Sequence, residues 1–123
     1  MCENGDDGSY DRENLSETDQ RIRELNDNLR RTFMGGRIML TIGFSDLPNL
    51  VKARAIAAIR SFDNFNEDND PYGTHEFGGV EIDDYTVWFR IDYYDHSLEY
   101  GSPDASDPNV TTRVMTLLLP SEY

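Results

Sequence analysis

The stretch FGGVEIDDYTVWFRIDYYD, residues 77–95, decides the fold of this chain. On both sides of Asp83-Asp84, a pair typical of a turn, apolar side chains alternate with polar ones. A period of two places successive side chains on opposite faces of a strand. The stretch therefore predicts a β-hairpin with one buried face. Its inward side chains are Val80, Ile82, Val87, Phe89, Ile91 and Tyr93.

Two amphipathic helices are predicted before this hairpin. The first begins at an N-cap, Ser16, and ends at Gly35-Gly36. Its apolar residues recur at spacings of three and four, which places Ile22, Leu25, Leu29 and Phe33 on one face. The second helix is capped by Ser45 or Asp46. Its apolar stripe is Leu47, Val51, Ala55, Ile59 and Phe62.

Three more extended stretches complete the pattern. RIMLTIGF, residues 37–44, is expected to form one strand with every second residue on the same face. SLEYGS, residues 97–102, is a shorter extended piece, and TTRVMTLLLP, residues 111–120, is the last strand. The order α-β-α-β-β-(β)-β predicts an α+β fold. In it, two helices pack on a largely antiparallel four- to five-stranded sheet.

The length of 123 residues suits a single domain, which is predicted to span residues 15–123. Residues 1–14 are polar and hold too few apolar side chains to offset the entropy of ordering, so they are predicted to form a flexible acidic tail. Neither a signal peptide nor a membrane span is expected, and Cys2 is the only cysteine. These features predict a cytoplasmic protein.

Acidic residues are concentrated in the second half of the chain. The net charge is −13, and residues 62–123 hold fourteen acids against two bases, whereas residues 35–61 hold one acid and four bases. Such a field repels nucleic acid and anionic membranes and attracts basic protein surfaces. A direct nucleic-acid or membrane partner is therefore not expected.

Several stretches resemble a small bacterial family of unknown function: RIRELNDNLRRT, GGRIMLT, FDNFNEDNDPYGTHEFG and IDYYDHSLEYGSPDASDPNVTTRVMTLLL. The resemblance covers roughly residues 19–123. It implies carriage on proteobacterial plasmids and other mobile elements, whose accessory genes often defeat host defences. It implies no catalytic residue, because no activity is established for the family.

Metal chemistry is the enzymatic alternative. His75, Asp92, Asp95 and His96 could together hold a divalent ion that activates water, although their spacing matches no familiar ligand pattern. Asp68, Asp70 and Gly73 fit only the beginning of a calcium-binding loop, because the twelfth position is Gly79 rather than glutamate. No cofactor is expected, and these residues are read first as turn and strand-end residues.

The alternative without catalysis is a binding surface made by the acidic half of the chain. Trp88 and Tyr94 are expected to share a strand face with Arg90 and Asp92, where aromatic side chains could act as interface anchors or lie under a helix. Carboxylates two residues apart on a strand are spaced like phosphates on nucleic acid. The predicted partner-binding residues are Glu67, Asp68, Asp70, Glu81, Asp83, Asp84, Trp88, Asp92, Tyr94, Asp95 and Glu99.

The hypothesis that follows is a non-catalytic inhibitor of a host defence system that targets nucleic acid, of the anti-CRISPR or antirestriction type. The inhibitor would occupy the basic groove of a nucleic-acid-binding protein or complex and imitate the bound polyanion. An acidic regulatory binding module remains open as an alternative, and so does a homodimer formed through an edge strand.

Overall fold

The computed structural model describes residues 15–123, so the predicted tail at residues 1–14 lies outside the described residues. Its elements follow the predicted order, with one additional short helix. They are α1 (Glu17–Thr32), β2 (Arg37–Leu40), α2 (Ile42–Ser45), α3 (Asn49–Arg60), β3 (Phe77–Ile82), β4 (Tyr85–Tyr94), β5 (Thr112–Leu118) and the 3-10 turn η3 (Pro120–Glu122).

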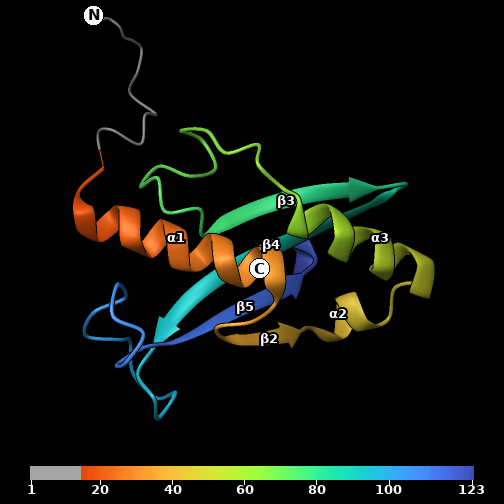
Figure 1. Cartoon of the computed structure of the whole chain (residues 1–123). Coiled ribbons are helices and arrows are strands. Elements are labelled where there is room, and N and C mark those ends of the chain that lie inside the picture. Colours follow the sequence, from red (N-terminus) through yellow and green to blue (C-terminus); the bar gives the residue numbers. More distant parts are fainter. Residues whose placement is uncertain (1–14) are drawn as a thin grey trace, which may run out of the picture.

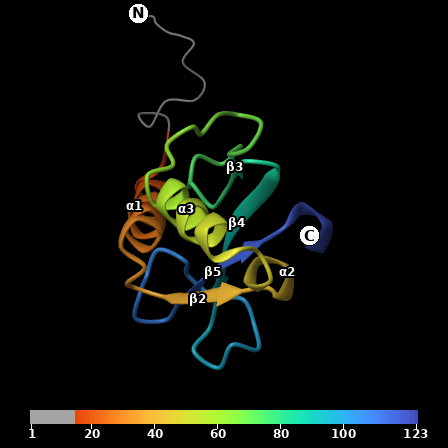
Figure 2. The same ribbon diagram turned by 90° about the vertical axis from the view of Figure 1, so that its right-hand side faces the viewer.

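The four strands form one mixed sheet in the order β2-β5-β4-β3. β4 pairs antiparallel with both of its neighbours, and β2 pairs parallel with β5 at the edge. Figures 1 and 2 show α1 and α3 side by side on one face of this sheet. The predicted α+β class, with helices on one face of a largely antiparallel sheet, is confirmed.

The hairpin forms as its alternation predicts. Val80 lies opposite Val87, and Asp83 and Asp84 make the turn between the strands. Asp83 has a φ of 55°, a left-handed conformation that aspartate adopts more readily than most residues. Except for the partly buried Tyr93, the core-facing side chains of β4 and β5 are buried. Their apolar members pack with Leu29 of α1 and the apolar stripe of α3. The hairpin thereby supplies the floor of the hydrophobic core.

The first helix begins at the predicted N-cap. The Ser16 hydroxyl accepts a hydrogen bond of 3.0 Å from the backbone N–H of Asp19. The helix ends slightly before the glycine pair, because Phe33 takes the left-handed conformation at its C-cap and donates its N–H to Leu29. Leu29 is buried and Phe33 packs against the core, as the spacing predicts.

The prediction of a single strand over residues 37–44 is wrong in its second half. Thr41 caps α2 by accepting the backbone N–H of Phe44 at 3.2 Å, and this turns the chain out of the sheet. Phe44 reaches the core from that helical turn, whereas Ile42 is 80% exposed. The carboxylate of Glu122, near the other end of the chain, receives the N–H of Gly43 and so stabilises the turn. The alternation of side chains within residues 37–44 could not show that Glu122, distant in the sequence, would stabilise a helical turn there.

The short extended piece at residues 97–102 also does not become a strand. Only the isolated bridge between Tyr94 and Gly101 joins it to the sheet. Residues 95–111 instead fold through local turns, in which side-chain oxygens accept nearby backbone N–H groups, for example Asp104 from Ser106 at 3.0 Å. Such turns satisfy the backbone without a neighbouring strand.

Gly36 is required for close packing between the α1–β2 connection and β5. A Cβ atom at Gly36 would lie 2.6 Å from the carbonyl oxygen of Arg113, a backbone atom that cannot rotate away. We expect Gly36→Ala to lower the free energy of unfolding by about 1–3 kcal/mol in denaturant titrations. Gly101→Ala is the matched control, because its nearest neighbour would be 3.9 Å away. An equal loss in both variants would contradict this account.

Candidate protein-binding face

One face of the sheet is not covered by α1 or α3. The side chains of Trp88, Arg90, Asp92 and Tyr94 point to this face, because they alternate along β4 with the buried residues of the core. Glu81 of β3 lies on the same face, since it pairs with Thr86 in the same alternating set. We call this surface the open face. The sequence left open whether Trp88 and Tyr94 lie under a helix. Neither α1 nor α3 covers them, and the end of the chain after η3 packs against Trp88.

An aromatic cluster occupies one part of the open face. The Trp88 ring meets Phe77 at 5.2 Å and Tyr123 at 5.6 Å between centroids, both edge to face. The Arg90 guanidinium lies 5.7 Å from the centre of the Tyr123 ring, and its Nε donates to Asp92 at 3.0 Å. Trp88 is therefore held rigidly by its neighbours, and Asp92 is paired rather than free.

A shallow apolar groove of about 480 Å³ occupies the other part of the open face. It runs from β2 across β5 to the end of β4. The Tyr94 ring forms part of its wall. The lining residues are Arg37, Met39, Leu40, Thr41, Tyr94, Leu98, Val114 and Thr116. A half-buried tyrosine beside an apolar groove has the character of an interface anchor, because it offers apolar area together with a polar tip.

Acidic turns lie at both ends of β4. Asp83 and Asp84 form the hairpin tip, and Asp95 and Glu99 follow the other end. These ends are about 30 Å apart, since β4 has ten residues and a strand rises ~3.3 Å per residue. Asp83 is partly neutralised by Arg54 of α3, at 3.1 Å. The structure thus divides the predicted carboxylates between separate places instead of gathering them in one continuous patch.

Asp95 and Asp84, at opposite ends of β4, differ in their surroundings. A hydrogen bond from the Ser97 hydroxyl, supported by backbone N–H groups, holds the pKa of Asp95 below its usual value. Asp95 therefore stays ionised while it orders its own turn. The Asp84 side chain is exposed at the hairpin tip. Asp84 and Asp95 therefore flank the open face at opposite ends of β4.

The remaining predicted acids lie in the loop over residues 61–76, on the helix side of the molecule (Figure 1). Glu67 and Asp68 are exposed there. Asp70 is only 1% exposed, and its carboxylate accepts the backbone N–H of His75 at 3.0 Å. Asp70 is thus an internal structural group of the loop, and the expectation that it faces a partner does not fit its burial.

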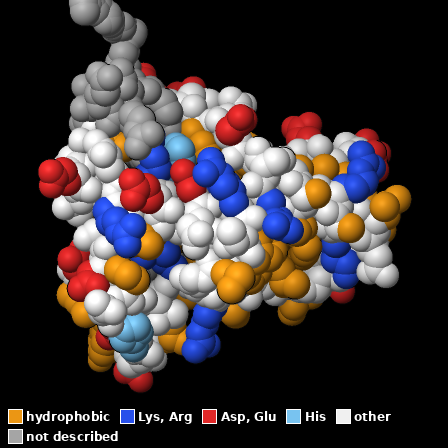
Figure 3. Space-filling view, in the orientation of Figure 1, with side chains coloured by type: hydrophobic (Ala, Val, Ile, Leu, Met, Phe, Trp, Pro, Cys, Tyr) orange, Lys and Arg blue, Asp and Glu red, His pale blue; other side chains and the backbone are white. Residues whose placement is uncertain are grey.

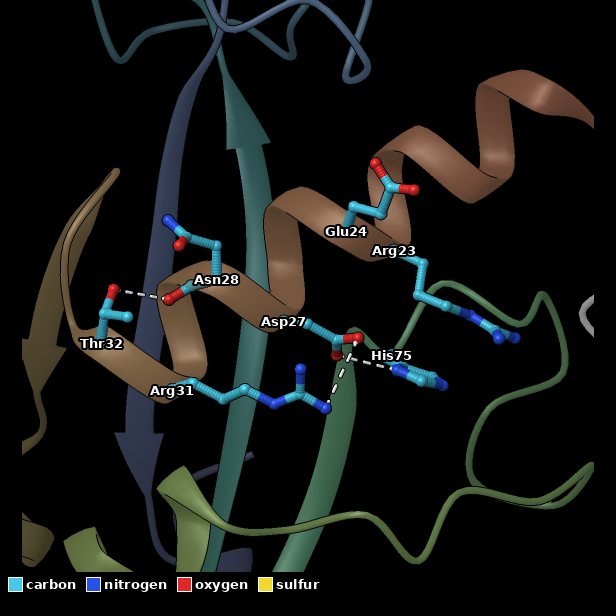
Figure 4. Close-up of a pocket in the computed structure, with 7 residues that line it drawn as sticks. All are labelled: Arg23, Glu24, Asp27, Asn28, Arg31, Thr32 and His75. Atoms are coloured by element: carbon cyan, nitrogen blue, oxygen red, sulfur yellow. Dashed lines mark hydrogen bonds and ion pairs between the residues drawn. The ribbon is translucent and has the colours of Figure 1, made fainter.

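His75 is clamped between two carboxylates. Its Nδ1 lies 2.8 Å from Asp27 of α1, and its Nε2 lies 3.7 Å from Asp70. The ring is also stacked on Phe65 at 3.8 Å. Figure 4 shows Asp27 and His75 meeting at a pocket of about 520 Å³ along α1. The Nδ1 contact with Asp27, the stacking on Phe65 and the nearby Asp70 hold this histidine as part of the fold.

His96 lies in a different environment from His75. Its two ring nitrogens contact the Thr112 hydroxyl at 3.0 Å and the Asn109 carbonyl at 2.6 Å. The structure does not bring His75, Asp92, Asp95 and His96 together, because His75 faces α1 while Asp92 lies on the open face. Within residues 15–123, no group of three or more His, Cys, Asp or Glu residues is arranged to hold a metal ion.

A buried polar network under α1 was not predicted. Asn26 is fully buried, where it donates to the Thr74 carbonyl at 2.9 Å and the Tyr93 hydroxyl at 2.8 Å, and accepts from Arg113 at 2.8 Å. Arg30, one turn later, is also fully buried and donates to Asp27 at 2.8 Å. The sequence contained one indication of this network. Asn26 and Arg30 are four residues apart, which places them together on the flank of the apolar stripe of α1.

The network shifts the acid–base properties of two members. Burial raises the pKa of Asp27, but hydrogen bonds and charges from His75 and Arg30 outweigh it, so the net pKa is lowered. Burial is also the main reason why the pKa of the Tyr93 hydroxyl is raised, and the negative charge of Glu76 adds to it. Asp27 is therefore charged and Tyr93 neutral at physiological pH.

The lowered pKa of Asp27 predicts a loss of stability in acid. A carboxyl group whose pKa is lower in the folded state contributes stability that is fully present above its ordinary value of 3.8 and is lost as the pH falls through the folded value. We expect Asp27→Asn to flatten the fall in unfolding free energy below about pH 4. Denaturant titrations across pH 2–6 would measure this slope, and an unchanged slope in the variant would contradict the assignment.

These features define a class of protein: a small acidic α+β protein whose mixed sheet carries helices on one face and leaves the other open. The chain belongs to the family described as protein of unknown function DUF3768, whose family model matches residues 40–122. The match runs from the end of β2 to η3 and does not include α1. The expected membership of a family of unknown function is confirmed.

Two other comparisons bear on the assignment. Neither the curated proteins nor the solved structures contain a significant match to this chain. The helices of the described residues are too short or too polar for any of them to cross a lipid bilayer.

Proposed function

We propose that this protein is a non-catalytic inhibitor of a host defence system that targets nucleic acid, of the anti-CRISPR or antirestriction type. It binds the basic groove of a nucleic-acid-binding component through its open face. The observation that carries the proposal is the combination on that face of aromatic side chains in the middle and acidic turns at both ends of β4.

The charge distribution supports the choice of a basic target. Residues 77–123, which supply β3, β4, β5 and the loops after them, hold nine acids and two bases. The helix side is different, because Lys and Arg side chains are spread over it (Figure 3). A partner with a positive groove is therefore attracted to the sheet side and its loops and oriented before contact.

The aromatic side chains and the acidic side chains contribute differently to binding in this mechanism. Tyr94 and the neighbouring apolar groove supply desolvated contact area, and Trp88 is held in place by Phe77 and Tyr123. The acidic turns, about 30 Å apart along the ten-residue strand β4, are separated by nearly one turn of duplex DNA, which is about 34 Å. They set the orientation and raise the association rate, and they contribute less to the lifetime of the complex.

Protection of phage or plasmid in defended cells tests this function. The protein is expressed in bacteria that carry individual restriction or CRISPR systems, and infection efficiency is measured. The open-face variant carries Glu81→Gln, Asp84→Asn and Glu99→Gln, three exposed acids at the face and its ends. The matched control carries Glu17→Gln, Glu24→Gln and Asp46→Asn, three exposed acids outside the open face.

Wild type and the control variant are expected to restore infection against one class of defence system, and the open-face variant is expected to lose this effect. Both variants have the same net charge, so a general effect of charge would change them equally. Equal activity of all three proteins, or no relief of any defence system by the wild type, would sink the proposal.

A further inference from the structure

The outer edge of β2 is an unpaired sheet edge. β2 pairs on one side with β5 and is the last strand of the described sheet on its other side. The Thr41 N–H points to β5, where it binds the Leu117 carbonyl at 3.1 Å. Because backbone groups alternate between the two sides of a strand, the N–H and C=O groups of Ile38 and Leu40 point outward.

Apolar side chains surround this edge. Met39 is 53% exposed and Leu40 is 49% exposed on β2, and Ile42, two residues after Leu40, is 80% exposed. Figure 3 shows hydrophobic side chains gathered over β2 and between it and α3. Natural proteins usually protect an edge of this kind with charges, prolines or a covering element, because it is a template for another strand.

We propose that β2 is the interface of a two-fold symmetric homodimer, in which the β2 strands of two copies pair antiparallel and join the two sheets. The inference does not depend on the proposed function. Its register follows from the outward groups. If Ile38 of each copy pairs with Leu40 of the partner subunit, all four backbone groups of each edge are satisfied, and Met39 lies on the symmetry axis opposite the partner's Met39.

This register also places complementary charges together. Arg37 lies opposite Thr41 of the partner subunit, two residues from the axis. Thr41 holds Glu122 through a hydrogen bond of 2.6 Å. Among residues 15–123 the guanidinium group of Arg37 makes no hydrogen bond or ion pair, and the carboxylate of Glu122 has no cationic partner. The dimer therefore forms two symmetric ion pairs, one on each side of the Met39 contact.

The charge distribution favours a second copy at this edge over contact between copies at other surfaces. Residues 35–61, which contain β2, α2 and α3, hold one acid and four bases. Residues 62–123 carry a net charge of −12, so contact between two copies through those segments brings like charges together. Antiparallel pairing at β2 keeps the two open faces on the same side of the joined sheet.

Disulfide trapping at the symmetry axis tests the register. Cys2 is first replaced by serine so that the introduced cysteine is the only thiol. Opposed residues at a pair of this type have Cα atoms about 4.5 Å apart, within the range of a disulfide. Met39→Cys is expected to cross-link rapidly under mild oxidation. Met34→Cys is the matched control, because Met34 is 70% exposed, more than Met39, and lies outside β2, five residues before Met39.

The oligomeric state and its charge dependence provide the second measurement. The chain with native Met39 is expected to sediment with about twice the 14.1 kDa mass of one chain. Arg37→Glu should shift it to monomer while the circular dichroism spectrum stays unchanged, because the exposed Arg37 side chain makes no hydrogen bond or ion pair within residues 15–123, and Arg37→Lys should retain the dimer. A monomeric wild type overturns the proposal, and so does equal cross-linking of the Met39→Cys and Met34→Cys variants.

Discussion

Asn26→Ala is expected to lower the free energy of unfolding by about 3–5 kcal/mol. The Asn26 amide is fully buried and bonds three groups from three different segments of the chain. Its removal leaves the Thr74 carbonyl and the Tyr93 hydroxyl without a donor. It also takes a side-chain acceptor from Arg113, a cation that is only 3% exposed.

Asn28→Ala is the matched control for this experiment. Asn28 lies on the same helix, is exposed, and makes one long hydrogen bond of 3.3 Å to the Met34 carbonyl. We expect its loss to cost no more than about 0.5 kcal/mol. Urea denaturation followed by circular dichroism measures both variants. If the two variants differ by less than about 1 kcal/mol, the buried network does not stabilise the fold as described.

Tyr94→Ala is expected to weaken binding of the target about 30-fold, which corresponds to about 2 kcal/mol. Tyr94 lines the apolar groove of the open face and does not belong to the buried core, so its truncation should leave the fold intact. Calorimetric titration of the purified target component, identified by the infection assay, measures the dissociation constant. The same titration at increasing salt should weaken binding, because the acidic turns act at long range.

Tyr72→Ala tests whether weaker binding is specific to a tyrosine of the open face or follows from the loss of any exposed tyrosine. Tyr72 is 72% exposed, and it lies in the loop over residues 61–76 on the helix side. This variant is expected to bind the target like the wild type. Equal weakening by Tyr72→Ala would move the interface to the helix side. An unchanged affinity of Tyr94→Ala would exclude Tyr94 as an anchor.

A dimer through β2 would enlarge the proposed binding surface. The open faces of the two copies would lie on the same side of a joined sheet, so one dimer could engage two basic sites on one target. Such bivalent binding raises apparent affinity when both sites can be reached at once. Arg37→Glu would then reduce the infection effect, both by breaking the dimer and by changing a residue that lines the groove. If a monomeric variant still restores infection fully, inhibition of the defence system does not require the dimer.

The sequence by itself determined the elements whose signal is local and periodic. Alternation placed Val87, Phe89 and Ile91 of β4 in the core, and Ser16 marked the beginning of α1. It also determined the total charge and its concentration in the second half. These features depend on neighbouring residues, or on composition alone, so no knowledge of distant contacts was needed.

Only the tertiary structure decided what each charged residue does. Asp70 and Glu67 stand three residues apart in one loop, yet Asp70 is buried against His75 while Glu67 is exposed. Arg30 follows a helical pattern typical of solvent-exposed positions, but the loop over residues 61–76 folds over it and removes it from water. The burial and pairing of a charge depend on segments that are distant in sequence, whereas a local pattern gives only the side of the helix or strand on which the charge lies.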